Sequence, residues 1–179
     1  MKKNGEFYGS HRVISPKGLL PQAADVIDNT TEIWDNEILL DVIALQPTAT
    51  AFHSLKNKFG EDIEGIKGEI IRIVEEKGKF QDPLTKSGGM LIGKVDKIGE
   101  AVADKVDVKV GDKVATLVSL SLTPLKIDEI YDINLDTEQV FCRAKAVIFE
   151  SGLYTRIPDD LGEELSLAIM DVAGAPAQI

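Results

Sequence analysis

The stretch Gly89-Met90-Leu91-Ile92-Gly93-Lys94-Val95-Asp96-Lys97-Ile98-Gly99, followed by Val110-Gly111-Asp112-Lys113-Val114, carries the clearest structural pattern in the chain. Apolar and polar side chains alternate in both segments, which is typical of β-strands with one buried face. Gly93 and Gly99 stand where a bent strand or a tight turn requires a residue without a β-carbon. Together with the alternating run at residues 140–149, these segments predict a small, partly open β-barrel.

Outward from this stretch, the pattern adds one long strand and two helices. Residues 37–45 form a nearly continuous apolar run, which predicts a strand buried on both faces or covered at its edge. The run ends near Pro47, after which Thr48 or Thr50 can cap a short helix. Residues 61–78 predict a longer helix, with isoleucines on one face and charges on the other. We therefore expect a mainly β protein with α additions.

The composition narrows the class of protein. The chain has 179 residues, with 20 basic and 30 acidic side chains and a formal net charge of −10. This balance argues against binding to nucleic acid or to an anionic membrane surface through bulk electrostatics. Much of the acidic surplus falls in the 61–78 helix and in residues 128–138, which we interpret as solvated surface. No apolar run approaches the ~20 residues of a membrane span, and we expect a soluble, cytoplasmic protein.

The glycine spacing resembles that of a known class of domain. Gly93-Lys94-Val95-Asp96-Lys97-Ile98-Gly99 matches a Gly-x-Val-x-x-x-Gly element, and Val110-Gly111-Asp112-Lys113-Val114 matches a Val-Gly-Asp-x-Val element. Both elements are similar to those of the GroES-like catalytic domain of medium-chain dehydrogenases. Arg156-Ile157-Pro158-Asp159-Asp160-Leu161 resembles the point where that domain passes into the helix before the nucleotide-binding domain.

A narrower resemblance covers nearly the whole chain. Residues 8–14, 16–18, 20–22, 86–93 and 170–178, together with the helix expected at 61–78, are similar to the L-erythro-3,5-diaminohexanoate dehydrogenase family of bacterial lysine fermentation. The resemblance implies an NAD-dependent oxidative deamination of a small diamino acid, 3,5-diaminohexanoate, to 5-amino-3-oxohexanoate with release of ammonia. It also implies a homo-oligomeric enzyme. Two alternatives remain: a zinc-free reductase similar to quinone oxidoreductases, and a non-enzymatic GroES-like module.

Two motifs of the wider class are missing from the sequence. Residues 46–53 lack the cysteine, and residues 87–90 lack the histidine, that hold zinc in many medium-chain dehydrogenases. The single Cys142 lies too far along the chain to replace them, so we expect no metal. No Gly-x-Gly-x-x-Gly follows a strand, so the cradle for a dinucleotide pyrophosphate is missing.

These absences suggest how the chain is organised. We expect residues 1–36 to be an N-terminal extension packed on the barrel and residues 37–160 to be the catalytic domain, with residues 61–78 as a helical insertion. Residues 161–179 would begin a linker helix toward a missing nucleotide-binding Rossmann domain. The isolated chain would then be inactive and would bind NAD weakly or not at all.

The segment after the long strand contains the candidate catalytic residue. His53 is the natural general base for the ammonium proton, although a histidine on a short helix is more often a surface or packing residue. Thr48 and Thr50 could bind substrate through their hydroxyl groups, or either could simply cap the helix.

A second set of candidates lies before the glycine-rich strand. Ser87, Gly88 and Gly89 could offer backbone amides to a substrate carboxylate or carbonyl, or could form a tight start to the strand. Asp82 and Lys86, just upstream, have suitable charges for an ammonium and a carboxylate, or are ordinary loop residues. Near the N-terminus, Arg12 could clamp a carboxylate, or could pair with one of the many acidic residues.

Overall fold

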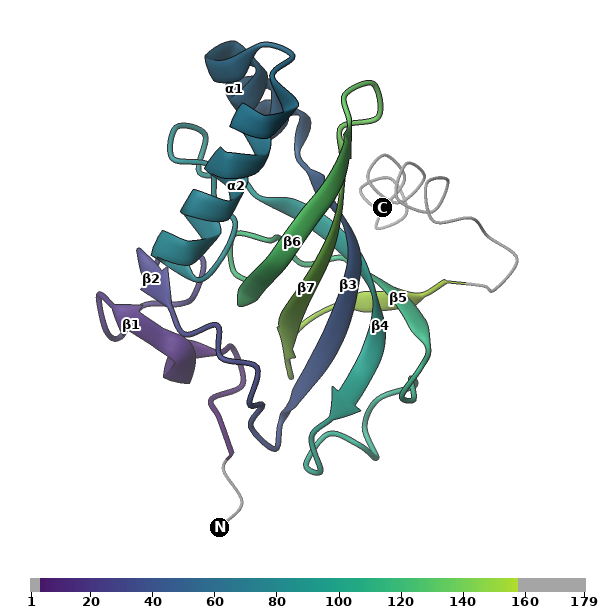
Figure 1. Cartoon of the computed structure of the whole chain (residues 1–179). Coiled ribbons are helices and arrows are strands. Elements are labelled where there is room, and N and C mark those ends of the chain that lie inside the picture. Colours follow the sequence, from purple (N-terminus) through teal and green to yellow (C-terminus); the bar gives the residue numbers. More distant parts are fainter. Residues whose placement is uncertain (1–3, 158–179) are drawn as a thin grey trace, which may run out of the picture.

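The computed structural model describes residues 4–157, and these form a strongly curved antiparallel sheet flanked by two helices (Figure 1). The large sheet has the strand order β6-β7-β3-β4-β5-β8, and β1 and β2 pair in a separate small sheet. The elements in chain order are η1 (Ser10–Arg12), β1 (Val13–Ser15), β2 (Val26–Ile27), β3 (Glu37–Pro47), α1 (Ala49–Phe59), α2 (Ile63–Lys77), β4 (Gly89–Ile98), β5 (Lys113–Thr116), β6 (Leu125–Asn134), β7 (Gln139–Phe149) and β8 (Tyr154–Arg156). The expected fold class, mainly β with α additions, is confirmed, and the open sheet is consistent with a partly open GroES-like barrel.

The long strand β3 is the centre of the sheet, as its apolar sequence predicts. It pairs with β4 on one side and with β7 on the other, so it has no free edge. The pairing register shifts between Val42 and Ala44 in both ladders, which places a bulge in the middle of the strand. As a result, Leu45 faces the main core, whereas Ala44 faces a smaller apolar cluster on the other side of the sheet.

The two helices follow β3 and cover one part of the main core. Thr48 caps α1 by accepting a hydrogen bond from the backbone N–H of Ala51 at 3.2 Å. Asp62 caps α2 in the same way through Gly65, and Gly78 ends it in a left-handed conformation with φ of 73°. The predicted helix at 61–78 is confirmed, with its apolar face formed by Ile66, Ile70, Ile73 and Val74.

Strand β6 was not predicted from the sequence. Residues 128–138, interpreted as solvated surface, belong largely to this strand, which pairs with β7. The acidic side chains lie on its exposed face, while Leu125, Ile130 and Ile133 are buried. The strand expected at Val110-Gly111-Asp112-Lys113-Val114 begins later than its pattern indicates, since the part that pairs in the sheet is Lys113–Thr116.

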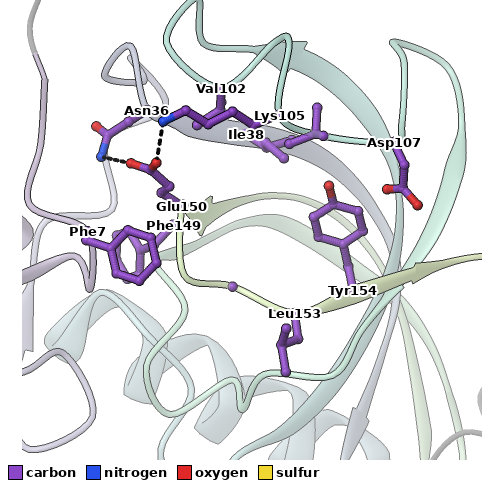
Figure 2. Close-up of a pocket in the computed structure, with 12 residues that line it drawn as sticks. Phe7, Asn36, Ile38, Val102, Lys105, Asp107, Phe149, Glu150, Leu153 and Tyr154 are labelled. Carbon is purple, nitrogen blue, oxygen red and sulfur yellow. Dashed lines mark hydrogen bonds and ion pairs between the residues drawn. The ribbon is translucent and has the colours of Figure 1, made fainter.

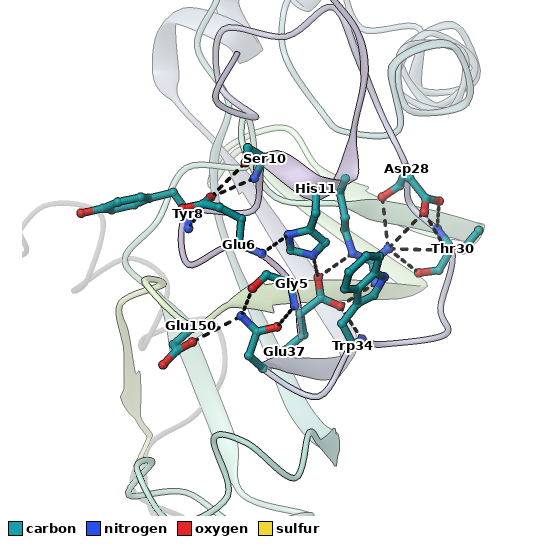
Figure 3. A network of polar contacts seen from close by, with 12 residues as sticks. Gly5, Glu6, Tyr8, Ser10, His11, Asp28, Thr30, Trp34, Glu37 and Glu150 are labelled. Atoms are coloured by element: carbon teal, nitrogen blue, oxygen red, sulfur yellow. Dashed lines mark hydrogen bonds and ion pairs between the residues drawn. The ribbon is translucent and has the colours of Figure 1, made fainter. Parts of the chain in front are cut away.

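The N-terminal segment is attached to β3 by a buried ion pair (Figure 3). Arg12 and Glu37 have fully buried side chains, and the guanidinium donates to the carboxylate from Nε at 2.7 Å and from Nη2 at 2.6 Å. The remaining guanidinium N–H groups donate to the carbonyl oxygens of Asp28, Thr30 and Glu32. Of the two roles considered for Arg12, pairing with an acidic residue is therefore the one that the structure shows.

Four further contacts hold this segment in place. The carboxylate of Glu37 also accepts from His11 Nε2 at 2.8 Å and from the backbone N–H of Trp34 at 2.9 Å. The rings of His11 and Trp34 are in contact, with centroids 4.4 Å apart and planes tilted by 46°. Lys79 is completely buried and donates to the carbonyl oxygen of Pro21 at 2.6 Å. The predicted linker at 161–179 lies outside the described residues.

Candidate active site

The end of β3 and the start of β4 bring together candidates that are almost forty residues apart in the sequence. The antiparallel register pairs Pro47 with Gly89, and the backbone N–H of Thr48 donates to the carbonyl of Gly88 at 3.1 Å. Thr48 and Thr50 at the start of α1 therefore lie beside Ser87 in the loop before β4. The structure thus brings together five of the six predicted site residues at one end of the sheet.

Four hydroxyl groups meet at this place, and we call Thr48, Thr50, Thr85 and Ser87 the hydroxyl cluster. The Oγ of Ser87 is its centre, at 2.8 Å from Thr48 Oγ1, 3.1 Å from Thr50 Oγ1 and 2.7 Å from Thr85 Oγ1. Thr48 Oγ1 and Thr50 Oγ1 are 3.1 Å apart. Hydroxyl groups that share hydrogen bonds in this way hold one another in fixed orientations.

A buried carboxylate determines the direction of these hydrogen bonds. Asp82 is 2% exposed, and its Oδ1 accepts the hydroxyl of Thr85 at 2.9 Å and the backbone N–H of Thr85 at 2.7 Å. A hydroxyl has one proton. Thr85 donates its proton to Asp82, so it must accept from Ser87. Ser87 then has no proton left for Thr48 and Thr50; it accepts from Thr48, and Thr50 donates its one proton to Ser87 or to Thr48.

The orientation has a chemical consequence. Protons in the cluster point from the threonines toward Asp82, so the lone pairs that remain are those of the hydroxyl oxygens of Thr48 and Thr50. Thr48 already uses one as the helix cap, accepting from Ala51. Thr50 is exposed, and its oxygen is therefore the acceptor that is best placed to meet a donor from outside, such as an ammonium group.

The two glycines allow the close approach of the strands. Gly89 has φ of +129°, and a β-carbon there would collide with the carbonyl oxygen of Gln46. Gly88 is buried, and a β-carbon would meet the backbone nitrogen of Ser121 and the hydroxyl of Ser119. The alternative of a tight start to the strand is therefore what these contacts support; a role of the glycine amides in binding an anion stays a prediction.

His53 occupies the next turn of α1, three residues after Thr50 on neighbouring positions of the helix surface. Its side chain is exposed, and no hydrogen bond within residues 4–157 joins it to the hydroxyl cluster. The structure therefore leaves the imidazole open to solvent beside the cluster, and its role as a base stays a prediction.

Of the residues that the sequence identified less clearly, Asp82 accepts a hydrogen bond from the hydroxyl cluster through Thr85, and Thr85 itself was overlooked. The signal for Thr85 was the Asp-x-x-Thr spacing, which is typical of a turn held by an aspartate side chain. Lys86 is exposed and has φ of 58°. Within residues 4–157, its side chain makes no hydrogen bond to the hydroxyl cluster.

Among residues 4–157, no group of three or more His, Cys, Asp or Glu side chains is arranged to hold a metal ion. Cys142 is buried in β7, and burial raises the pKa of its thiol to about 12. In the same part of the chain, no helix is long and apolar enough to cross a bilayer.

The fold and the cluster define a mainly β, partly open barrel domain with polar groups gathered at one end of its central strand. The family model for the L-erythro-3,5-diaminohexanoate dehydrogenase N-terminal domain matches residues 11–158, and the chain belongs to this family.

Two curated relatives extend the match. An L-erythro-3,5-diaminohexanoate dehydrogenase of Fusobacterium nucleatum is 55% identical over 177 residues, covering 99% of this chain and 51% of the relative. One of Acetoanaerobium sticklandii is 56% identical over 171 residues, covering 96% of this chain and 50% of the relative. The chain therefore spans about half the length of these relatives. Among solved structures, 2R,3R-butanediol dehydrogenase from Bacillus subtilis is 18% identical with a TM-score of 0.36, over 80% of this chain and 40% of that one.

Proposed function

We propose that this chain is the substrate-side domain of a cytoplasmic, zinc-independent dehydrogenase that oxidatively deaminates L-erythro-3,5-diaminohexanoate to 5-amino-3-oxohexanoate in lysine fermentation. The observation that carries the proposal is the family match over residues 11–158, together with relatives of that name at 55% and 56% identity. The complete enzyme would act as a homo-oligomer with NAD as its cofactor.

The residues present do not fit the binding of the NAD pyrophosphate. The sequence has no Gly-x-Gly-x-x-Gly, and the described residues form an antiparallel sheet without the parallel strand–helix–strand unit that such a cradle needs. In the proposal, a second domain of the complete enzyme holds the cofactor. Bound there, NAD would accept a hydride from substrate.

The hydroxyl cluster suits one part of the substrate, its ammonium group. Because the protons of the cluster point toward Asp82, the oxygens of Thr48 and Thr50 are acceptors rather than donors toward a ligand. An ammonium has three N–H donors and no acceptor, so it complements this arrangement. We assign Thr48 and Thr50 to direct contact with the substrate, with Ser87 orienting their hydroxyl groups and the backbone of Gly88 and Gly89 holding Ser87 in place.

His53 is the proposed general base. It lies one helical turn beyond Thr50 and is exposed, so a substrate ammonium held at Thr50 would come close to the imidazole. The neutral ring would take a proton from the ammonium and so produce the free amine that oxidation requires. The substrate ammonium is expected on the open side of the hydroxyl cluster, beside Thr50, and not at Asp82, which faces the interior.

The activity is tested on the complete enzyme, with NADH formation and ammonia release measured on the diamino acid. Equal amounts of NADH and ammonia are expected. Turnover of enones with a reduced cofactor, and none of the diamino acid, would instead support the quinone-oxidoreductase-like alternative.

The cluster is tested by Thr50→Val and Thr50→Ser in the same enzyme. Valine keeps the shape of threonine but removes the acceptor oxygen, and we expect kcat/KM to fall about 10- to 100-fold, the range for one hydrogen bond to a charged group. Serine keeps the oxygen and should retain most of the activity. Equal losses in both variants would show that the methyl group, not the hydroxyl, is what matters. For the base, His53→Gln should lower kcat, because glutamine cannot take the proton.

A further inference from the structure

A pocket of about 350 Å³ lies at the opposite end of β3 from the hydroxyl cluster (Figure 2). Ile38, near the start of the strand, contributes to its wall, whereas Thr48 follows the strand's last residue. Ten residues of extended chain separate the two, roughly 30 Å at about 3.3 Å per residue. The volume is in the range of small-molecule sites, at its lower end.

The walls of the pocket are largely apolar, and three segments besides the start of β3 contribute to them. Phe7 belongs to the N-terminal segment, Val102 to the connection between β4 and β5, and Phe149 to the end of β7. Val102 and Phe149 are almost completely buried, whereas Phe7 is 45% exposed. A ligand here would contact segments that are far apart in the sequence.

The polar groups on one side of the pocket satisfy one another. Glu150 accepts from Lys105 Nζ at 2.7 Å and from Asn36 Nδ2 at 3.3 Å, so both of its carboxylate oxygens are engaged. Asn36 is buried and exchanges hydrogen bonds with the backbone of Gly5. The polar groups on this side therefore complete one another's hydrogen bonds and do not need a ligand for this.

The other side of the pocket has two polar groups that are available to a ligand, the Tyr154 hydroxyl and the Asp107 carboxylate. Figure 2 shows the Tyr154 hydroxyl pointing into the space below Lys105 and the Asp107 carboxylate at the rim beyond it. Within residues 4–157, neither group takes part in a hydrogen bond or an ion pair. Burial, and the nearby charge of Asp107, raise the pKa of Tyr154, so the phenol stays protonated at neutral pH.

The net charge of the pocket indicates the sign of the charge on its ligand. Glu150 and Asp107 supply two negative charges and Lys105 one positive charge, which leaves the pocket with a single negative charge that has no internal partner. We propose that this pocket binds a primary alkylammonium ion, with its charge beside Asp107 and Tyr154 and its aliphatic chain against Ile38, Val102 and Phe149. The assignment goes beyond the proposed dehydrogenase activity and does not depend on it.

The experiment uses the 179-residue chain and two probes of equal length, hexylammonium and hexanoate, followed by amide chemical shifts in a two-dimensional NMR titration at neutral pH. We expect saturable shifts with hexylammonium, concentrated in residues 102–107 and 149–154. Hexanoate, which has the same apolar chain but the opposite charge, should give none. Equal binding of both probes would overturn the proposal, because the site would then be selecting for apolar surface alone.

Three variants test whether Asp107 and Tyr154 bind the ammonium group. Asp107→Asn should weaken hexylammonium binding about two- to fivefold, the usual size of a partly exposed ion pair. Tyr154→Phe should weaken it as well, because the phenol oxygen is lost while the ring remains. Asp104→Asn is the matched control, since Asp104 is an exposed aspartate in the same connection that does not line the pocket. If Asp104→Asn weakens binding as much as Asp107→Asn, the effect is only net charge, and the proposed site is wrong.

Discussion

Replacing Glu37 with glutamine would leave Arg12 as a buried cation without its carboxylate. Glu37 is completely buried and accepts four hydrogen bonds, two from Arg12, one from His11 and one from the backbone of Trp34. Removing one partner of a buried ion pair costs about 3–5 kcal/mol, because the other charge cannot return to water while the protein stays folded. We expect Glu37→Gln to lower the free energy of unfolding by that amount.

The pKa of Glu37 leads to a similar magnitude. Burial alone would raise this pKa, but hydrogen bonds from Arg12 and His11 outweigh the burial and lower it from 4.5 to about 2. At about 1.4 kcal/mol per pH unit, this shift corresponds to about 3 kcal/mol of stability. Because the pKa is lower in the folded state, the contribution is complete above pH 4.5 and is lost as the pH falls toward 2. The difference between wild type and Glu37→Gln should therefore shrink over that interval.

The measurement is urea unfolding of the chain, followed by the fluorescence of its single tryptophan, Trp34, and by far-UV circular dichroism. Glu129→Gln is the matched control, since the Arg143–Glu129 pair at 3.1 Å is more than half exposed and its loss should cost less than about 1 kcal/mol. Arg12→Met combined with Glu37→Gln should cost less than the sum of the single changes. A Glu37→Gln loss no larger than that of Glu129→Gln would refute the reasoning.

Three further predictions concern the packing of the domain. Gly89→Ala should cost about 2–3 kcal/mol in urea unfolding, because φ of +129° and the carbonyl of Gln46 exclude a β-carbon, whereas Gly68→Ala, in open space on α2, should stabilise by about 0.5–1 kcal/mol. Similar effects of the two changes would contradict the strand geometry. Lys79→Met should cost about 1–3 kcal/mol, because the carbonyl oxygens of Pro21 and Gln22 lose their buried donor, and an unchanged unfolding midpoint would count against that anchor. Cys142 should be inert to a thiol reagent in the folded chain and react in full in denaturant, since burial raises its pKa to about 12; fast reaction in the folded chain would show that β7 opens readily.

The sequence predicted those elements whose pattern is simple. A continuous apolar run marked β3, isoleucines at helical spacing marked α2, and alternation marked β4 and β7. Strand β6 was missed because its register with β7 shifts twice, between Ile127 and Glu129 and between Ile130 and Asp132, which breaks the alternation of its buried residues. Its acidic residues then look like a solvated loop, although they form the exposed face of a strand.

For the site, the sequence predicted positions but not contacts. Thr48, Thr50 and Ser87 were singled out, and the pairing of β3 with β4 does bring them together. What the sequence could not show is that Thr85 and Asp82 orient them, because that depends on which oxygen lies within hydrogen-bonding distance of which hydroxyl. Likewise, the sequence left Arg12 two roles, a carboxylate clamp or an ion pair with an acidic residue. It could not identify Glu37 as the partner, because an acidic residue at the start of an apolar strand resembles an ordinary flanking charge.

Gly89 connects the fold to the hydroxyl cluster. The ladder between β3 and β4 continues to the pair Pro47–Gly89 only because no β-carbon stands between Gly89 and the carbonyl of Gln46. That last pair determines how close the loop carrying Ser87 comes to the cap of α1, where Thr48 Oγ1 lies 2.8 Å from Ser87 Oγ. An outward shift of even 1 Å would exceed the range of a hydroxyl hydrogen bond, and Thr48 and Thr50 would then be free to reorient. Substitution of this glycine should therefore weaken substrate binding in the complete enzyme as well as the stability of the domain, although the residue has no side chain to offer a ligand.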